Sequence, residues 1–239
     1  MCDLLNENKK NDENERKEDD DDDAAVVLPM DGYHYSLKEL NSMDTDNPKK
    51  DFIYRRGAPD TFDVTALKND LHQIKYGSER SGLLSTIIDA TATNEPSNVN
   101  NTTDSATASS SSSSSSSMMR IVRIPGFDHA IGDPIPNVHI FDRDKHTIVI
   151  MEGLYLLHQD QDDHRNDWNG VTTYFDETIY IDMDLTICMD RLKKRNLCLP
   201  GYTTPEEIYQ RVDIVDHQNA RIVQQTKHLA NTIVIGYTT

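Results

Sequence analysis

Short apolar runs alternate with segments of helical periodicity along most of the chain. Apolar runs at residues 24–30, 119–124, 146–151 and 178–183 predict β-strands, and a last short strand is expected at residues 232–235. The run at 146–151 (HTIVIM) is apolar almost throughout, which is typical of a strand that is covered on both faces.

Three helices are predicted between these runs. Asp63 can cap a helix whose apolar residues recur at helical spacing as far as residue 74. Asp184 can cap a second helix. Residues 204–207 (Thr-Pro-Glu-Glu) have capping-box spacing with proline in the first turn, and their helix should run to about Leu229. Strands that alternate with helices predict an α/β domain with a parallel sheet.

Two polar stretches interrupt the pattern. Residues 1–23 form a charged tail that ends in five aspartates, and a Ser/Thr/Asn-rich stretch from about 77 to 118 contains a run of nine serines. Neither stretch can bury enough apolar surface to offset the entropy lost on ordering. We expect a disordered acidic tail, followed by one domain at residues 24–239 that a disordered insertion interrupts.

Composition narrows the class of protein. The formal charge of -17 argues against nucleic acid as the main partner, because phosphate backbones recruit basic surfaces. No apolar run approaches the roughly 20 residues that span a bilayer. The three cysteines show no C-x-x-C spacing, and their odd number suggests a reducing compartment. The sequence therefore favours a cytoplasmic protein with no membrane span.

Carboxylates follow two of the predicted strands, where ligands bind in open α/β sheets. Asp31 comes after the first strand and could accept a proton from a substrate hydroxyl, or it could form a turn with Gly32; spacing alone does not separate these interpretations. Glu152 ends the apolar run at 146–151. It could help to hold Mg²⁺ or simply reach solvent, and the apolar run favours the metal role because burying an unpaired carboxylate is costly.

Two further clusters contain residue types that bind ligands. Arg191 and Arg195 are spaced i,i+4 on one helical face and could close over phosphates, although a solvated basic face is commoner. Residues 158–164 (HQDQDDH) contain metal-ligating types. We interpret this run as an acidic surface loop, because it offers no rigid helical pair of histidines.

Five motifs in order make the pattern more specific: MDGYHY (30–35), RRGAPDTFD (55–63), PGFDHAIGDP (125–134), IVIMEGLYLL (148–157) and RLKKRN (191–196). Together they resemble the uridine kinase, phosphoribulokinase and bacterial pantothenate kinase group, most of all its fungal ATP-dependent kinases, whose acceptor is not assigned. The resemblance covers nearly all of the chain outside the two polar stretches. It implies a P-loop NTPase-like parallel sheet with flanking helices, and transfer of the γ-phosphoryl group of ATP to a hydroxyl of a small molecule.

The resemblance also implies roles for single residues. Asp31 matches the catalytic base, and Glu152 matches the carboxylate near Mg²⁺. Arg191 and Arg195 match the lid arginines that face the ATP phosphates. An acceptor-binding role is implied for His34, Arg55, Arg56, Asp63, Asp128 and His129, with the two arginines as partners for an acidic group.

One motif of the group is absent. The group begins with a strand, a G-x-x-x-x-G-K-[ST] loop and a helix, and the loop holds the phosphates through its backbone N–H groups and its lysine. The 239 residues contain no such loop; residues 77–82 have the glycine spacing but are followed by two leucines. In the group this strand lies inside the sheet, so omitting it would leave its neighbours with unpaired backbone groups.

Two interpretations of the missing loop remain open. The chain could be an N-terminally incomplete form of a kinase, inactive alone, or a non-catalytic relative that acts as a binding or regulatory protein. We favour the first, because the downstream residues still match a working site. The sequence does not identify the acceptor, and it leaves a homo-oligomer open.

Overall fold

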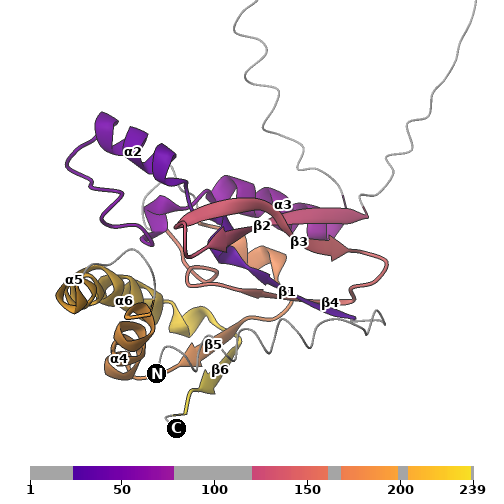
Figure 1. Ribbon diagram of the computed structural model, residues 1–239. Coiled ribbons are helices and arrows are strands. Elements are labelled where there is room, and N and C mark those ends of the chain that lie inside the picture. The colour runs from indigo at the N-terminus through magenta and orange to yellow at the C-terminus, as the bar shows by residue number, and fades with distance from the viewer. Residues whose placement is uncertain (1–23, 78–119, 161–167, 199–203, 238–239) are drawn as a thin grey trace, which may run out of the picture.

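The computed structural model describes residues 24–77, 120–160, 168–198 and 204–237 (Figure 1). The acidic tail and nearly all of the Ser/Thr/Asn-rich insertion lie outside these ranges, so their disorder stays a prediction. Among the described residues, no helix combines the length and the apolar character needed to cross a bilayer.

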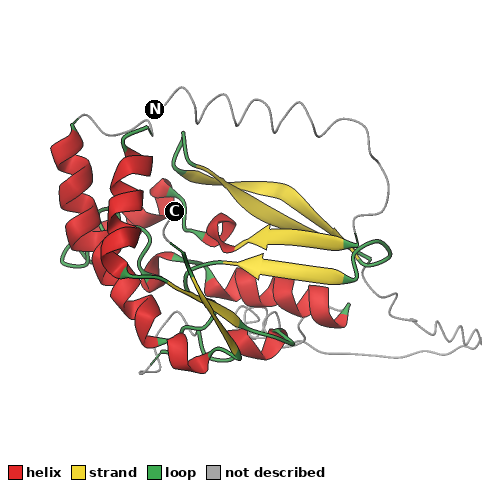
Figure 2. Cartoon of the chain, turned by 90° about the horizontal axis from the view of Figure 1, so that it is seen from below, coloured by secondary structure: helices red, strands yellow, loops and turns green. Residues whose placement is uncertain are grey.

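Two parallel strand pairs confirm the predicted α/β class. β1 (Ala25–Pro29) pairs with β4 (Ile148–Glu152) in a register that joins Ala25 to Ile148 and Pro29 to Glu152. β5 (Ile179–Asp182) pairs with β6 (Thr232–Ile235). The two pairs are separate two-stranded sheets, which Figure 2 shows beside the helices.

An antiparallel hairpin is the main addition to the predicted fold. β2 (Ile121–Asp128) was expected, but β3 (Asp133–Asp142) was not. Its sequence, DPIPNVHIFD, has two prolines among its first four residues, which weaken a strand signal. The hairpin packs on α3 (Val64–Tyr76) and on the 3₁₀ turn η1 (Met30–Tyr33).

The predicted helix starts are all observed. Asp63 accepts a hydrogen bond from the Ala66 N–H at 2.9 Å, and Asp184 accepts one from the Thr186 N–H at 2.8 Å at the start of α4 (Leu185–Asn196). The helix that begins after Thr204 comprises α5 (Pro205–Arg211), a π-helical turn η4 (Val212–Asp216) and α6 (His217–Gln225), followed by the 3₁₀ turn η5 (Lys227–Leu229).

One helix was not predicted. α2 (Leu37–Asp46) starts with a complete capping box, in which Ser36 and Glu39 bond to each other's backbone N–H groups. This Ser-x-x-Glu spacing was a usable signal in the sequence.

The main core lies on one face of the β1–β4 pair. Leu28 of β1 is fully buried, while Val149 and Met151 of β4 pack against the same cluster, together with Leu67 of α3 and Trp168. Two short 3₁₀ turns, η2 (Pro59–Thr61) and η3 (Val171–Tyr174), complete this side.

The expectation that β4 is covered on both faces is wrong for this chain. Its side chains alternate, and Ile148 and Ile150 are 56% and 51% exposed. Within the described ranges, nothing covers this second face of the pair. The apolar run correctly indicated a strand, but its burial depends on elements that the structure does not place there.

Candidate active site

Asp31 and Glu152 lie at the carboxyl ends of two adjacent parallel strands. Pro29, the last residue of β1, is the register partner of Glu152, and Asp31 follows two positions later in η1. Partial burial, and secondly the negative charge of Asp31, raise the pKa of Glu152. The two carboxylates are therefore close enough to repel each other, as expected from their places at the strand ends.

Two glycines fix the backbone around this pair. A Cβ atom on Gly32 would overlap the backbone of Pro125 in β2, and one on Gly153 would overlap the side chain of Met30. The turns after β1 and β4 therefore pack closely against neighbouring elements, which holds both carboxylates in place.

His34 supports the turn that carries Asp31. Its Nδ1 lies 2.8 Å from the Asp31 carbonyl oxygen, and because a carbonyl can only accept, Nδ1 carries the proton. The ring lies against Phe62 and Phe127, with centroid distances of 3.9 Å and 4.9 Å. Burial lowers the pKa of His34, so the imidazole is neutral near pH 7 and its Nε2 can accept a hydrogen bond.

The predicted acceptor-binding arginines are engaged by protein groups. Arg55 pairs with Asp60 at 2.7 Å and donates to the Lys50 carbonyl. Arg56 donates to the carbonyls of Gly132 and Tyr35, and its second terminal nitrogen also pairs with Asp133 at 3.2 Å. The structure thus gives both guanidinium groups a structural role, and their binding of an acceptor stays a prediction.

The other predicted acceptor residues lie around the same loops. Asp63 caps α3. Asp128 accepts hydrogen bonds from the N–H groups of Ala130 and Ile131 in the hairpin turn, at 2.7 Å and 3.2 Å. His129 is exposed and makes an edge contact with Phe127. Asp63 and Asp128 thus shape the loops around His34, and no described contact assigns them a ligand.

The two arginines of α4 point to different partners. Arg191 donates to the Tyr237 carbonyl at 3.2 Å and lies 3.3 Å from the Met183 sulfur, so it covers the ends of β5 and β6. Arg195 acts electrostatically on Asp216 at the end of the π turn. Among the described contacts, neither arginine touches Asp31 or Glu152, and their convergence on one phosphate site stays a prediction.

Asp216 is a site candidate that had no predicted role. Burial raises its pKa, while the charges of Arg211 and Arg195 oppose that rise. Its charge in turn helps to raise the pKa of Tyr155, after the larger effect of burial; Tyr155 donates to the Gly57 carbonyl at 2.7 Å. π-helical turns are frequent at functional sites, but a single sequence carries no clear signal for one.

A cleft of about 1540 Å³ lies beside these loops. Tyr35, Phe52, Arg55 and Trp168 line it on one side, and Ile222 lines it from α6. Asp31 and Glu152 are not among its lining residues. The cleft is therefore next to the predicted acceptor loops rather than at the two carboxylates.

Metal-binding capacity is limited in the part of the chain that the structure describes. No group of three or more His, Cys, Asp or Glu residues there could hold an ion. The predicted acidic loop begins with His158, which lies 3.4 Å from Asp160, and the rest of that run falls outside the described ranges. Asp31 and Glu152 form a two-carboxylate set, which suits Mg²⁺ because Mg²⁺ keeps several waters or phosphate oxygens in its shell.

No family model matches the chain, but several curated proteins are similar to it in sequence. It is 29% identical over 199 residues to the "Putative uridine kinase C227.14" of Schizosaccharomyces pombe, covering 83% of this chain and 64% of that protein. It is 31% identical to the "ATP-dependent kinase YFH7" of Vanderwaltozyma polyspora, covering 83% and 52%, and 31% identical to that of Lachancea thermotolerans, covering 87% and 56%. The chain is thus similar in sequence to these kinases over most of its own length. It spans about half to two thirds of their length.

Solved structures show the fold of the chain. A "putative fructose transport system kinase" from Silicibacter sp. has a TM-score of 0.59 at 20% identity, covering 88% of this chain and 74% of that one. The Saccharomyces cerevisiae YFH7 structure, described as a "putative P-loop containing kinase with a circular permutation", has a TM-score of 0.57 at 23% identity, covering 90% and 59%. The chain thus has the P-loop kinase fold, and the resemblance seen in its motifs is confirmed.

Proposed function

We propose that this chain forms the acceptor side of an ATP-dependent kinase that phosphorylates a hydroxyl of a small molecule. The proposal is carried by the closeness of Asp31 and Glu152 at the ends of β1 and β4. Asp31 takes the proton of the acceptor hydroxyl as its oxygen bonds to the γ-phosphorus. The bond from that phosphorus to the bridging oxygen breaks, and ADP leaves.

Glu152 would hold Mg²⁺, directly or through water. The repulsion between Glu152 and Asp31, which contributes to the raised pKa of Glu152, would be relieved by a divalent cation. Bound Mg²⁺ neutralises charge on the transferred phosphoryl group. The protein's own part is to present a fixed carboxylate, which the tight packing of Gly153 against Met30 supports.

The arginines of α4 would neutralise the ATP phosphates. Arg191 is already at the carboxyl ends of β5 and β6, the side of a parallel pair where ligands bind. Arg195, which now interacts electrostatically with Asp216, would instead pair with a phosphate oxygen of ATP. The cleft lined by Tyr35 and Arg55 offers room for the part of the acceptor that lies away from the reacting hydroxyl.

The reaction needs a phosphate-binding loop that the 239 residues do not contain. We propose that such a loop belongs to a longer form of the protein, in line with the greater length of the curated relatives. The present chain alone should therefore be inactive. A cytoplasmic location and self-association remain predictions from the sequence.

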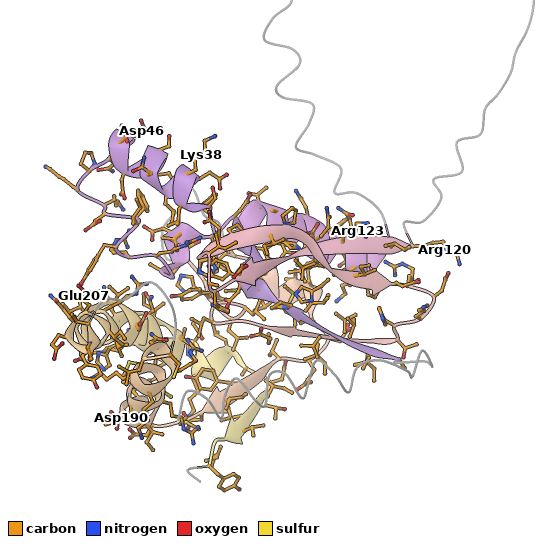
Figure 3. All side chains as sticks on the ribbon, in the orientation of Figure 1. Lys38, Asp46, Arg120, Arg123, Asp190 and Glu207 are labelled. Atoms are coloured by element: carbon orange, nitrogen blue, oxygen red, sulfur yellow. The ribbon has the colours of Figure 1, made fainter. Side chains whose placement is uncertain are left out.

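Transfer of labelled γ-phosphate tests the proposal on a form that contains the loop. Asp31→Asn should lower kcat about 10²-fold or more with little change in the KM for ATP, because the base acts in the transition state. Asp190→Asn, on the outer side of α4 (Figure 3), is the matched control and should leave both constants unchanged. Equal losses in kcat and in ATP affinity for Asp31→Asn would remove Asp31 from the role of base.

The absence of the loop also favours a second candidate, a non-catalytic binding protein that keeps the acceptor pocket. Mg-ATP separates the two. A kinase form gains about 2.7 kcal/mol of stability at a ligand concentration 100 times Kd, whereas a non-catalytic relative without a nucleotide site gains none. A thermal melt of the loop-containing form with and without Mg-ATP measures this difference.

A further inference from the structure

The large cleft beside the predicted acceptor loops is lined in part by two helices. α2 contributes Met43 and Asp46, and α6 contributes Ile222 and Gln225. Figure 1 shows these helices at the same end of the strands. The volume of about 1540 Å³ exceeds the roughly 300–1,000 Å³ of typical small-molecule sites. The cleft therefore has room for a small ligand, and its lining residues indicate the chemistry of that ligand.

Acidic side chains outnumber lysine and arginine in the lining of the cleft. Two of its members already form a pair, since Arg55 lies 2.7 Å from Asp60. The remaining excess of negative charge repels an acidic ligand and attracts a cation. The ionisable lining residues are Glu39, Asp46, Asp60 and Asp160, Lys50 and Arg55, and the histidines His158 and His228.

Asp160 is a partly buried lining carboxylate with no lysine or arginine partner among the described residues. It accepts a hydrogen bond from the Trp168 backbone N–H at 2.8 Å, and its Oδ1 lies 3.4 Å from Nε2 of His158. Burial lowers the pKa of His158, so this imidazole is mostly neutral near pH 7. The Asp160 side chain is only 21% exposed, so water and salt screen its charge less than that of a surface carboxylate.

A second lining carboxylate has an acceptor atom to spare. Arg55 pairs with Oδ2 of Asp60, while Oδ1 is buried and has no hydrogen-bond partner in the part of the chain that the structure describes. A buried acceptor without a donor is costly, and natural structures seldom leave one unsatisfied. The cleft thus offers acceptors and negative charge, which suit a ligand that brings N–H donors.

We propose that this cleft binds a small organic cation, an amine with an apolar or aromatic part, and that Asp160 receives its ammonium group. The ammonium group donates hydrogen bonds to the carboxylate, and a charged pair of this kind is stronger than a neutral hydrogen bond. The apolar part of the ligand lies against the apolar lining, which comprises Tyr35, Met43, Phe52, Ile222 and Leu229. A carboxylate or phosphate in the same place would meet the like charge of Asp160.

The inference rests on the proposed function in one respect, the role of this ligand as phosphoryl acceptor. In that role the ligand is an amino alcohol that extends from the cleft to Asp31, with its hydroxyl at the carboxylate and its ammonium group at Asp160. This differs from the expectation that Arg55 pairs with an acidic group of the acceptor, because Asp60 already occupies that guanidinium.

Trp168 provides a direct readout of binding to the present chain. It lines the cleft and is the single tryptophan of the sequence, so its fluorescence reports on this place alone. The probes are 2-phenylethylamine, 3-phenylpropionate and 2-phenylethanol, which share a phenyl group and differ in charge. We expect a saturable change with the amine, at a Kd about tenfold or more below that of the other two probes.

Two substitutions test whether Asp160 and the cleft select the charge. Asp160→Asn should weaken binding of the amine about tenfold and leave the alcohol unchanged. Gln225→Lys adds a cation at an exposed lining position at the end of α6; it should weaken the amine and strengthen 3-phenylpropionate. Asp190→Asn on the outer side of α4 is the control and should change neither. Urea midpoints check that each variant is folded.

Four results would overturn the proposal. The first is tighter or equal binding of 3-phenylpropionate, which would make the ligand acidic, and the second is equal binding of the amine and the alcohol, which would leave only apolar contact. The third is amine binding that neither Asp160→Asn nor Gln225→Lys alters, and the fourth is no saturable change with any probe at millimolar concentration. Selective amine binding by a chain whose loop-containing form transfers no phosphate would uphold the site and count against the proposed function. Phosphoryl transfer without amine selectivity would do the reverse.

Discussion

The two parallel pairs of this chain differ sharply in how much core they share. The β1–β4 pair belongs to a cluster of 13 buried apolar residues that includes Trp168 and Phe62. The helices that follow the β5 strand share a cluster of only three, Met189, Ile208 and Val212. Both regions form their predicted elements, so local sequence patterns are enough to specify strands and helices but not to bury them.

The difference indicates where the stability of the chain resides. Buried apolar area is the main stabilising term in folding, and the first region holds most of it. The second region has the smaller buried cluster and is tied to the first in part by hydrogen bonds.

Removal of Trp168 should produce the largest loss. Its ring is fully buried between Phe62 and Tyr155, with centroid distances of 6.0 Å and 5.6 Å, and its Nε1–H donates to the Pro59 carbonyl. Trp168→Ala should lower the free energy of unfolding by about 3–5 kcal/mol because it leaves a large cavity. Urea unfolding measures this loss.

The matched control for Trp168→Ala lies in the second region. Ile181→Ala truncates a side chain that is 69% exposed and should change the urea midpoint very little. Equal losses for the two variants would mean that the β5–β6 pair is as well covered as the main core, and the contrast between the regions would fail.

Arg211 should produce a smaller loss that is confined to the contact between the regions. From α5 its guanidinium donates to the carbonyls of Tyr54 and Arg56, both at 2.7 Å. Arg211→Ala should cost about 1.5–3 kcal/mol, the range for hydrogen bonds to charged groups. Amides of α5 and α6 should exchange faster, while those of β1 and β4 should not change.

An arginine on the same helical segment is the control for Arg211→Ala. Arg221 is exposed on α6, and Arg221→Ala should leave the exchange of both regions unchanged. Faster exchange in β1 and β4 after Arg211→Ala would show that the two regions unfold as one cooperative unit.

The sequence predicted elements that depend on local chemistry. The caps at Asp63, Asp184 and Thr204 and the four strands β1, β4, β5 and β6 follow from residue type and spacing within a few positions. The hairpin strand β3 was missed because its pairing with β2, rather than its own pattern, makes it a strand. α2 was missed although its capping box is readable in the sequence.

The site was predictable only in part, for a related reason. Asp31 and Glu152 could be placed together because parallel strands bring their carboxyl ends to one edge. The partners of Arg56 could not be foreseen, because Gly132 and Asp133 are 76 and 77 residues away along the chain. Contacts of this kind depend on tertiary packing, which a single sequence does not reveal.

The smallest expected effect concerns the pH dependence that Glu152 adds to the first region. Burial and the charge of Asp31 raise the pKa of Glu152 above its ordinary value of 4.5. The folded state therefore binds the proton of the Glu152 carboxyl group more tightly than the unfolded state does. The free energy of unfolding should therefore fall as the pH rises from 4.5 through the raised pKa.

Glu152→Gln cannot ionise, so its free energy of unfolding should not show this fall. The variant should therefore become more stable relative to the wild type as the pH rises across that window. Urea midpoints between pH 4 and 7 measure the difference, with Asp190→Asn as the exposed control. A difference that stays constant across the window would show that Glu152 ionises without a cost to the fold, and the repulsion from Asp31 would then be absent.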